Sequence, residues 1–215
     1  MNSSAIIARI VSYVFHPLML PAFGLFLVFH LDNSGLWAQS LQVQLYLFAF
    51  TLITTFVFPL MNVFLLLKLK LISSLEMETK EERRIPYLAA AIFYFAESYF
   101  LFNADVPAPV KAMMFGATLL VVLVFVINFF WKISAHMVGA GGLAGMMIAL
   151  SSRMQINVLY MIMALILISG VVGWARLRIS THTQSQVYAG FLLGVFVEWQ
   201  LFSPYPVPIP FLPGK

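Results

Sequence analysis

The chain alternates between long apolar runs and short polar stretches. Seven runs are predicted to be helices that cross a membrane. The run 137–150 makes only about 21 Å of helix at about 1.5 Å per residue. We therefore expect this helix to include part of the preceding polar stretch, or to lie in a thinned region of membrane. A brief turn is expected at 151–155. The seven runs cover about residues 10–30, 45–67, 87–102, 110–131, 137–150, 156–174 and 187–202.

Two of these runs contain residues that are unusual in lipid. The first run is interrupted by His16, Pro17 and Pro21, which should kink or delay its helix or make it re-entrant. We interpret His16 as a packed or interfacial side chain. Glu97 lies within the third run. A carboxylate in lipid costs about 2–4 kcal/mol, so we expect Glu97 to face the bundle or a wet cavity.

Composition agrees with this pattern. Of the 215 residues, 62% are hydrophobic and 9% are charged, and the mean hydropathy is +0.95. These values exclude a water-soluble globular chain. We predict an all-α fold, a polytopic transmembrane bundle of six or seven helices that forms a single integral-membrane domain over residues 1–215. The proline-rich tail 203–215 is expected to be extended. The absence of cysteine excludes disulfides and thiolate catalysis.

The net charge of +4 is modest, but the positive residues are unevenly placed. Nine of the twelve Lys and Arg residues lie in alternate gaps between runs, which favours a cytoplasmic location for those gaps. Five of the nine belong to a candidate site or adjoin it: Lys80, Arg83, Arg84, Lys132 and Arg176. Without these five, four positive residues remain in the alternate gaps against three in the other gaps. Anionic lipid is the expected partner, and nucleic acid is not, because no basic face is interleaved with aromatic residues. The nine are Arg9, Lys68, Lys70, Lys80, Arg83, Arg84, Lys132, Arg176 and Arg178.

Three clusters of polar side chains stand between the apolar runs, and an even number of runs separates each cluster from the next. All three should therefore emerge on the same face of the membrane, where they can form one site. Arginine binds a phosphate dianion through paired hydrogen bonds, and histidine can act as a nucleophile or as a proton donor near neutral pH. The clusters are Lys80, Arg83 and Arg84; Ser134 and His136; and Arg176, His182 and Gln186.

The spacing within these clusters resembles that of the phosphatidic acid phosphatase type 2 superfamily. The last motif of that family is an arginine, five residues, a histidine, three residues and an aspartate. Arg176 and His182 match it, and Gln186 stands at the position of the aspartate. The middle motif is Pro-Ser-Gly-His, and Ser134 and His136 are in register with its serine and histidine.

The first family motif is a lysine followed after six residues by arginine and proline. Here Ile85 separates Arg84 from Pro86, and Lys80 stands closer to both arginines than the motif requires. Either Arg83 or Arg84 can therefore be the phosphate ligand. The resemblance covers about residues 80–194, the motif-bearing core.

The resemblance implies a role for each residue of the clusters. His182 is the expected nucleophile, His136 the expected general acid, and Gln186 the side chain that orients His182. The resemblance implies neither metal nor cofactor, and two histidines without matching carboxylates make a poor metal site. The phosphate would be held by Arg176, Ser134 and one or both of Arg83 and Arg84, together with Lys80.

The expected function is that of an integral-membrane, metal-independent phosphatase acting on a lipid phosphate or polyprenyl diphosphate through a phosphohistidine. Two alternatives remain. Gln186 lacks the charge of an aspartate, which favours a lipid-phosphate binding or transport protein without hydrolysis. A purely structural membrane subunit is the other. We expect a multi-pass protein of a bacterial inner membrane, and the sequence leaves the lipid and the oligomeric state open.

Overall fold

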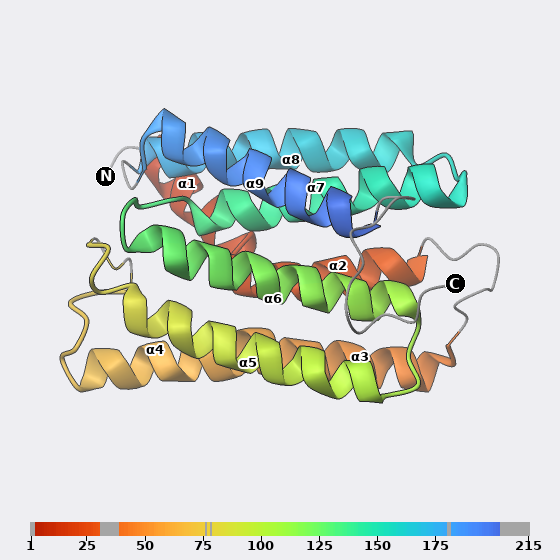
Figure 1. The fold of residues 1–215 in the computed structure, drawn as a ribbon. Helices are drawn as coiled ribbons and strands as arrows, with labels where there is room; N and C mark the ends of the chain where they lie inside the picture. Colours follow the sequence, from red (N-terminus) through yellow and green to blue (C-terminus); the bar gives the residue numbers. More distant parts are fainter. Residues whose placement is uncertain (1–2, 31–38, 76, 78, 180–181, 203–215) are drawn as a thin grey trace. The chain divides into compact units, whose positions relative to one another are not determined.

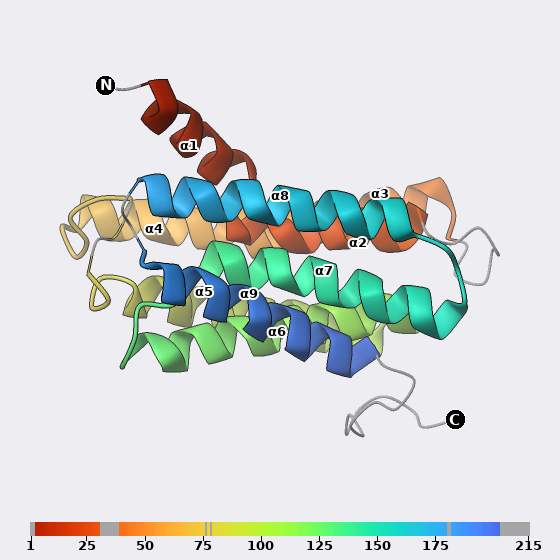
Figure 2. The same ribbon diagram turned by 90° about the horizontal axis from the view of Figure 1, so that it is seen from above.

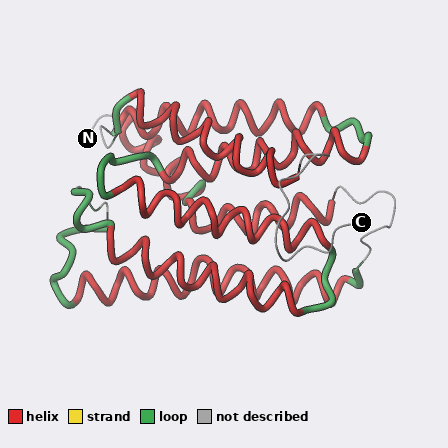
Figure 3. Tube along the Cα trace, viewed as in Figure 1, coloured by secondary structure: helices red, strands yellow, loops and turns green. Residues whose placement is uncertain are grey.

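The computed structural model describes residues 3–30, 39–75, 77, 79–179 and 182–202. All regular structure in these residues is helical (Figures 1 and 3). The predicted all-α fold of six or seven long helices is therefore confirmed. Six helical stretches are long and apolar enough to cross a membrane: Ser3–His30, Leu41–Lys68, Arg84–Asn103, Ala108–Asn128, Ala135–Met154 and Leu159–Arg178. A seventh long helix, α9 (Gln184–Phe202), is not one of these six. It contains two glutamines in its first turn and Glu198 near its end.

The described chain packs into two compact units. One combines residues 1–17 with residues 126–215, and the other comprises residues 18–125. Each is described by itself below. The expectation of a single integral-membrane domain over residues 1–215 stays a prediction, and the tail 203–215 lies outside the described residues.

The unit 18–125 contains two long helical stretches and parts of two others. A π-helical turn, η2 (Ile53–Val57), joins α3 to α4 without interrupting the helical course of the chain. Pro59 follows this turn and has no N–H to donate, so a regular α-helical hydrogen bond is missing there. The helices are α2 (Leu20–His30), α3 (Leu41–Leu52), α4 (Phe58–Lys68), α5 (Arg84–Asn103) and α6 (Ala108–Asn128), of which α6 continues into the other unit.

The other unit is built from α1 (Ser3–Val14), α7 (Ala135–Met154), α8 (Leu159–Arg178) and α9. Helix α1 packs against α8, and α7 packs against both α8 and α9. The Arg178 side chain donates hydrogen bonds to the Ser4 hydroxyl at 3.0 and 2.9 Å, which ties the end of α8 to the start of α1. A short 3-10 turn, η1 (Pro17–Met19), follows α1, so the break expected at His16 and Pro17 is present.

Helices α7 and α9 run side by side and in the same direction (Figures 1 and 2). Glycines of α9 make the approach possible. A Cβ on Gly190 would lie 2.9 Å from the Ser134 carbonyl oxygen, and a Cβ on Gly194 would lie 2.6 Å from the Gly142 nitrogen. Both distances are too short for a real side chain. Small residues therefore permit close helix contact here.

Two boundaries differ in an informative way from the sequence expectation. Helix α7 begins inside the second polar cluster, at Ala135, so its length comes from including part of that cluster, as one of the two alternatives required. The turn predicted at 151–155 is wrong for most of its length, because α7 continues to Met154 and ends at Gln155 with φ 55°. No proline or glycine follows Gly145 to stop the helix earlier.

Candidate functional site

Three segments of the unit formed by residues 1–17 and 126–215 come together at the start of α7 and α9. They are the connection before α7, the last turn of α8 and the connection before α9. The Ser134 N–H donates to the Gln186 carbonyl oxygen at 3.3 Å. Because the glycines of α9 let α7 lie directly against it, this backbone contact forms where both helices begin. The second and third polar clusters of the sequence therefore meet.

His182 is buried and held through one ring nitrogen. Its Nδ1 lies 3.1 Å from the Lys132 carbonyl oxygen and 3.2 Å from Gln186 Oε1. The Thr183 N–H donates to the same Gln186 oxygen at 3.1 Å, which identifies that atom as the amide oxygen. Since both neighbours of Nδ1 are acceptors, Nδ1 carries the hydrogen and donates it. The neutral ring then has its lone pair on Nε2.

His136 is oriented by the first helix of the chain. Its Nε2 lies 3.1 Å from the Ser12 carbonyl oxygen, so Nε2 carries a hydrogen and Nδ1 is the other titrating atom. The ring of His16 stands edge-on to that of His136, with the centroids 5.6 Å apart and the planes at 74°. His16 reaches this position because the helix ends at Val14, just before Pro17.

Arg176 places a positive charge among these rings. Its side chain is buried and interacts electrostatically with both His16 and His136. Ser134 is fully buried, and within the described residues its hydroxyl has no hydrogen-bond partner. A buried guanidinium, imidazole N–H groups and an unpaired hydroxyl are groups that bind an anion.

The side chains here offer little to a metal ion. In the described part of the chain, no group of three or more His, Asp or Glu residues is arranged to hold one. The absence of a metal or other cofactor from the chemistry stays a prediction from the residue types.

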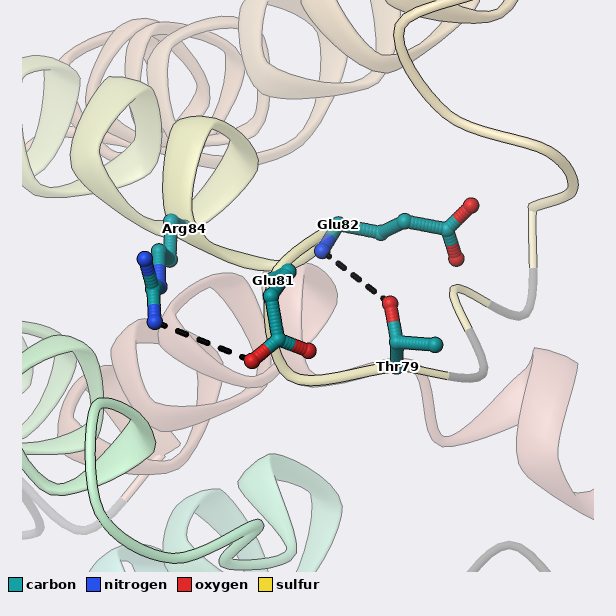
Figure 4. A network of polar contacts seen from close by, with 4 residues as sticks. All are labelled: Thr79, Glu81, Glu82 and Arg84. Atoms are coloured by element: carbon teal, nitrogen blue, oxygen red, sulfur yellow. Dashed lines mark hydrogen bonds and ion pairs between the residues drawn. The ribbon is translucent and has the colours of Figure 1, made fainter.

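The first polar cluster belongs to the other compact unit, residues 18–125. Arg83 is buried and donates from Nε to the Met77 carbonyl oxygen at 2.8 Å. The Arg84 side chain is 41% exposed and forms an ion pair with Glu81 at 3.7 Å (Figure 4). Lys80 lies in the same loop, partly exposed. The assignment of these three residues to a phosphate site stays a prediction from the sequence.

Sequence reasoning missed two participants. His16 is packed against His136, which is one of the two settings expected for it. Ser12 and Lys132 act through main-chain carbonyls. A main-chain carbonyl is present at every residue, so no pattern of side chains in the sequence indicates that these two act as acceptors.

Compared with known protein families, with curated proteins and with solved structures, the chain matches none of them. The resemblance to the phosphatidic acid phosphatase type 2 superfamily therefore stays an expectation from the motif residues.

Proposed function

We propose that this chain is an integral-membrane phosphatase that hydrolyses a lipid phosphate or a polyprenyl diphosphate through a phosphohistidine. The observation that carries the proposal is the hydrogen bonding of His182. Its Nδ1 donates toward two acceptors, Lys132 O and Gln186 Oε1, so the lone pair that would attack phosphorus is the one on Nε2.

In the first step, His182 Nε2 forms a bond to phosphorus, and the bond from phosphorus to the leaving oxygen breaks with its electron pair. His136, protonated on both ring nitrogens, gives the proton that this oxygen needs from Nδ1, because its Nε2 hydrogen is engaged by Ser12. The product that leaves is an alcohol from a monoester, or a prenyl phosphate from a diphosphate.

In the second step, water attacks the phosphorus and gives a proton to His136 Nδ1. The bond from nitrogen to phosphorus breaks, and its electron pair returns to His182 Nε2. Arg176 and the Ser134 hydroxyl bind the phosphoryl oxygens in both steps, which is where charge spreads in the transition state.

Gln186 bears on the rate of this reaction. His182 becomes positively charged when it forms the bond to phosphorus, and a carboxylate on Nδ1 would stabilise that charge more than two neutral carbonyl groups do. In a well-studied serine protease triad, loss of such a charge lowers the rate by about four orders of magnitude. We therefore expect turnover to be slow.

The test is release of phosphate by purified protein from short-chain phosphatidate and from a prenyl diphosphate. We expect His182→Ala to lower the rate at least about a thousandfold. His30→Ala is the matched control, since His30 is exposed at the end of α2 and bonds only to its own helix at Phe26 among the contacts described. Equal rates in the wild type and the His182 variant would refute the phosphohistidine mechanism.

A second candidate function is binding or transport of a lipid phosphate without hydrolysis. The neutral amide of Gln186 on His182 favours it, because it orients the ring without stabilising a charged intermediate. Gln186→Asp separates the two functions. A slow phosphatase should gain at least about tenfold in rate. If the wild type binds a lipid phosphate without hydrolysing it, and only the Gln186→Asp variant hydrolyses it, the chain is the binding protein.

A further inference from the structure

Glu97 is a buried acid in the unit 18–125 that the proposed phosphatase chemistry does not use. It lies on α5, is fully buried and faces the π-helical turn η2. In the described part of the chain, an ion pair joins Arg84 to Glu81, and no cation lies within ion-pair distance of Glu97. An ionised carboxylate without a partner in such a place is costly, so what satisfies Glu97 has to be found among neutral groups.

Two threonine hydroxyls contact the carboxyl group. Thr51 Oγ1 donates to Glu97 Oε1 at 2.5 Å, and Thr54 Oγ1 is hydrogen-bonded to Glu97 Oε2. Thr51 is in the last turn of α3 and Thr54 is in η2. The last turn of α3 and the π-helical turn thus present one hydroxyl each to the same side chain, and π-helical turns are frequent at functional sites.

A count of hydrogens favours a protonated carboxyl group. Thr54 Oγ1 lies 2.8 Å from the Phe50 carbonyl oxygen as well as in hydrogen-bond contact with Glu97 Oε2. A hydroxyl has a single hydrogen, and the Phe50 carbonyl can only accept. If Thr54 donates to Phe50, the hydrogen between Thr54 and Glu97 has to come from Glu97. All the contacts are then satisfied when Oε2 carries a proton and Oε1 accepts from Thr51.

The neighbouring groups are consistent with this count. Thr55 gives its hydrogen to the Thr51 carbonyl oxygen at 2.7 Å, so in the side-chain hydrogen bond between Tyr94 and Thr55 the phenol is the donor. From α6, Thr118 donates to the Tyr94 carbonyl oxygen at 3.0 Å. Among described residues, the groups facing Glu97 are therefore threonines from α3 and η2 and the titratable Tyr94 from its own helix.

We propose that Glu97 is a proton-binding site within the membrane-spanning part of the chain, holding one proton on Oε2 that it donates to Thr54. A metal cation does not fit the same atoms. Metal ligands surround the ion at about 2.0–2.6 Å from it, whereas here the oxygens of Thr51 and Glu97 approach each other directly at 2.5 Å. The proposal is independent of whether the histidine cluster hydrolyses phosphate.

The site couples proton binding to helix packing. Removal of the proton would leave Thr54 Oγ1 between two acceptors, Phe50 O and Glu97 Oε2, with one hydrogen for both. Thr54 can then bond to only one of these acceptors at a time, so release of the proton changes the hydrogen bonding between α5 and η2.

Infrared difference spectroscopy of the full-length protein tests the proposal. The spectrum of the wild type minus that of Glu97→Gln, at neutral pH, should contain the carbonyl stretch of a protonated carboxylic acid. Carboxylate stretches in its place, without the acid band, would overturn the proposal. Glu198→Gln is the control, since Glu198 is a second buried carboxyl group, in the other unit, whose removal should leave the Glu97 band unchanged.

A second variant keeps the acid and changes only its partner. Thr54→Val removes the oxygen that accepts the Glu97 proton, so the acid band should move to higher frequency as that hydrogen bond is lost. Thr118→Val, a change in the same unit that does not touch Glu97, should leave the band in place. An unmoved band in the Thr54 variant would refute the assignment of the proton to that contact.

Discussion

The two hydrogen bonds on His182 Nδ1 differ in how far the sequence reveals them. The Gln186 contact follows from spacing, because Gln186 stands four residues after His182, at the start of a helix. The Lys132 contact does not, because the acceptor is a backbone carbonyl fifty positions away in the sequence. Spacing finds residues that act through their side chains near a helix end. It cannot find peptide groups that the fold brings in.

The Ser134 hydroxyl provides a test of the anion site at the scale of one atom. A buried hydroxyl without a hydrogen-bond partner lowers the folding stability of the free protein. When a phosphate binds, this hydroxyl gains a partner. We expect Ser134→Ala to leave the melting temperature of the free protein unchanged or higher. We expect the same change to raise KM for the phosphate substrate about fivefold, or about 1 kcal/mol.

Ser169→Ala is the matched control for this prediction. Ser169 is also buried, but its hydroxyl donates to the Leu165 carbonyl oxygen at 2.7 Å. Its removal should lower stability slightly and leave KM unchanged. A Ser134 variant that melts lower and binds substrate as the wild type does would contradict the assignment.

At the scale of helices, the contact between α7 and α9 is what holds the candidate site together. We expect Gly194→Ala to cost about 1–3 kcal/mol of unfolding free energy, because the new methyl group would meet the backbone of α7 at Gly142. Turnover should fall as well, since the shift would separate Ser134 from Gln186. Chemical denaturation and phosphate release measure the two effects.

Gly170→Ala is the corresponding control on α8. A Cβ there meets nothing within 4 Å, so the replacement should stabilise the helix by about 0.5–1 kcal/mol. Equal stabilities for the two alanine variants would show that the glycines of α9 are not needed for packing.

Helix number and most helix positions follow from the apolar runs, but two features of the helices do not. The π-helical turn η2 lies in a run, Leu41–Lys68, whose hydrophobicity is the same on either side of it. Its position depends on Pro59 and on threonines that serve Glu97, which only contacts across helices reveal. The extension of α7 beyond Leu150 was missed because polar serines and an arginine are compatible with either a turn or a helix end.

At the scale of the whole molecule, the exposed side chains agree with a protein that faces lipid. Large apolar residues remain exposed along the middle of several helices, as Phe95 and Phe100 do on α5, Leu167 on α8, and Leu192 and Phe196 on α9. In water such surfaces would promote aggregation, whereas in a bilayer they are solvated by acyl chains. The six candidate spans make this a multi-pass membrane protein.

The orientation of the chain stays a prediction from charge. If all seven long helices cross the membrane, the polar clusters share one face and Lys215 lies on the other. The positive residues favour a cytoplasmic face for the clusters. A fluorescent or phosphatase reporter fused at Lys215 should then report a location outside the cytoplasm. A cytoplasmic reporter signal would reverse the assignment and place His136 and His182 outside.

The Lys132 carbonyl contact also determines which experiments can detect it. Alanine scanning replaces side chains and leaves every peptide group in place, so Lys132→Ala should retain the acceptor for His182 Nδ1. The Ser12 carbonyl that orients His136 escapes such a scan in the same way. A scan of single-residue replacements would therefore detect both histidines and miss the two carbonyl groups that orient their rings. Backbone amide-to-ester exchange, which weakens a carbonyl as an acceptor, is the kind of change that would make these groups visible.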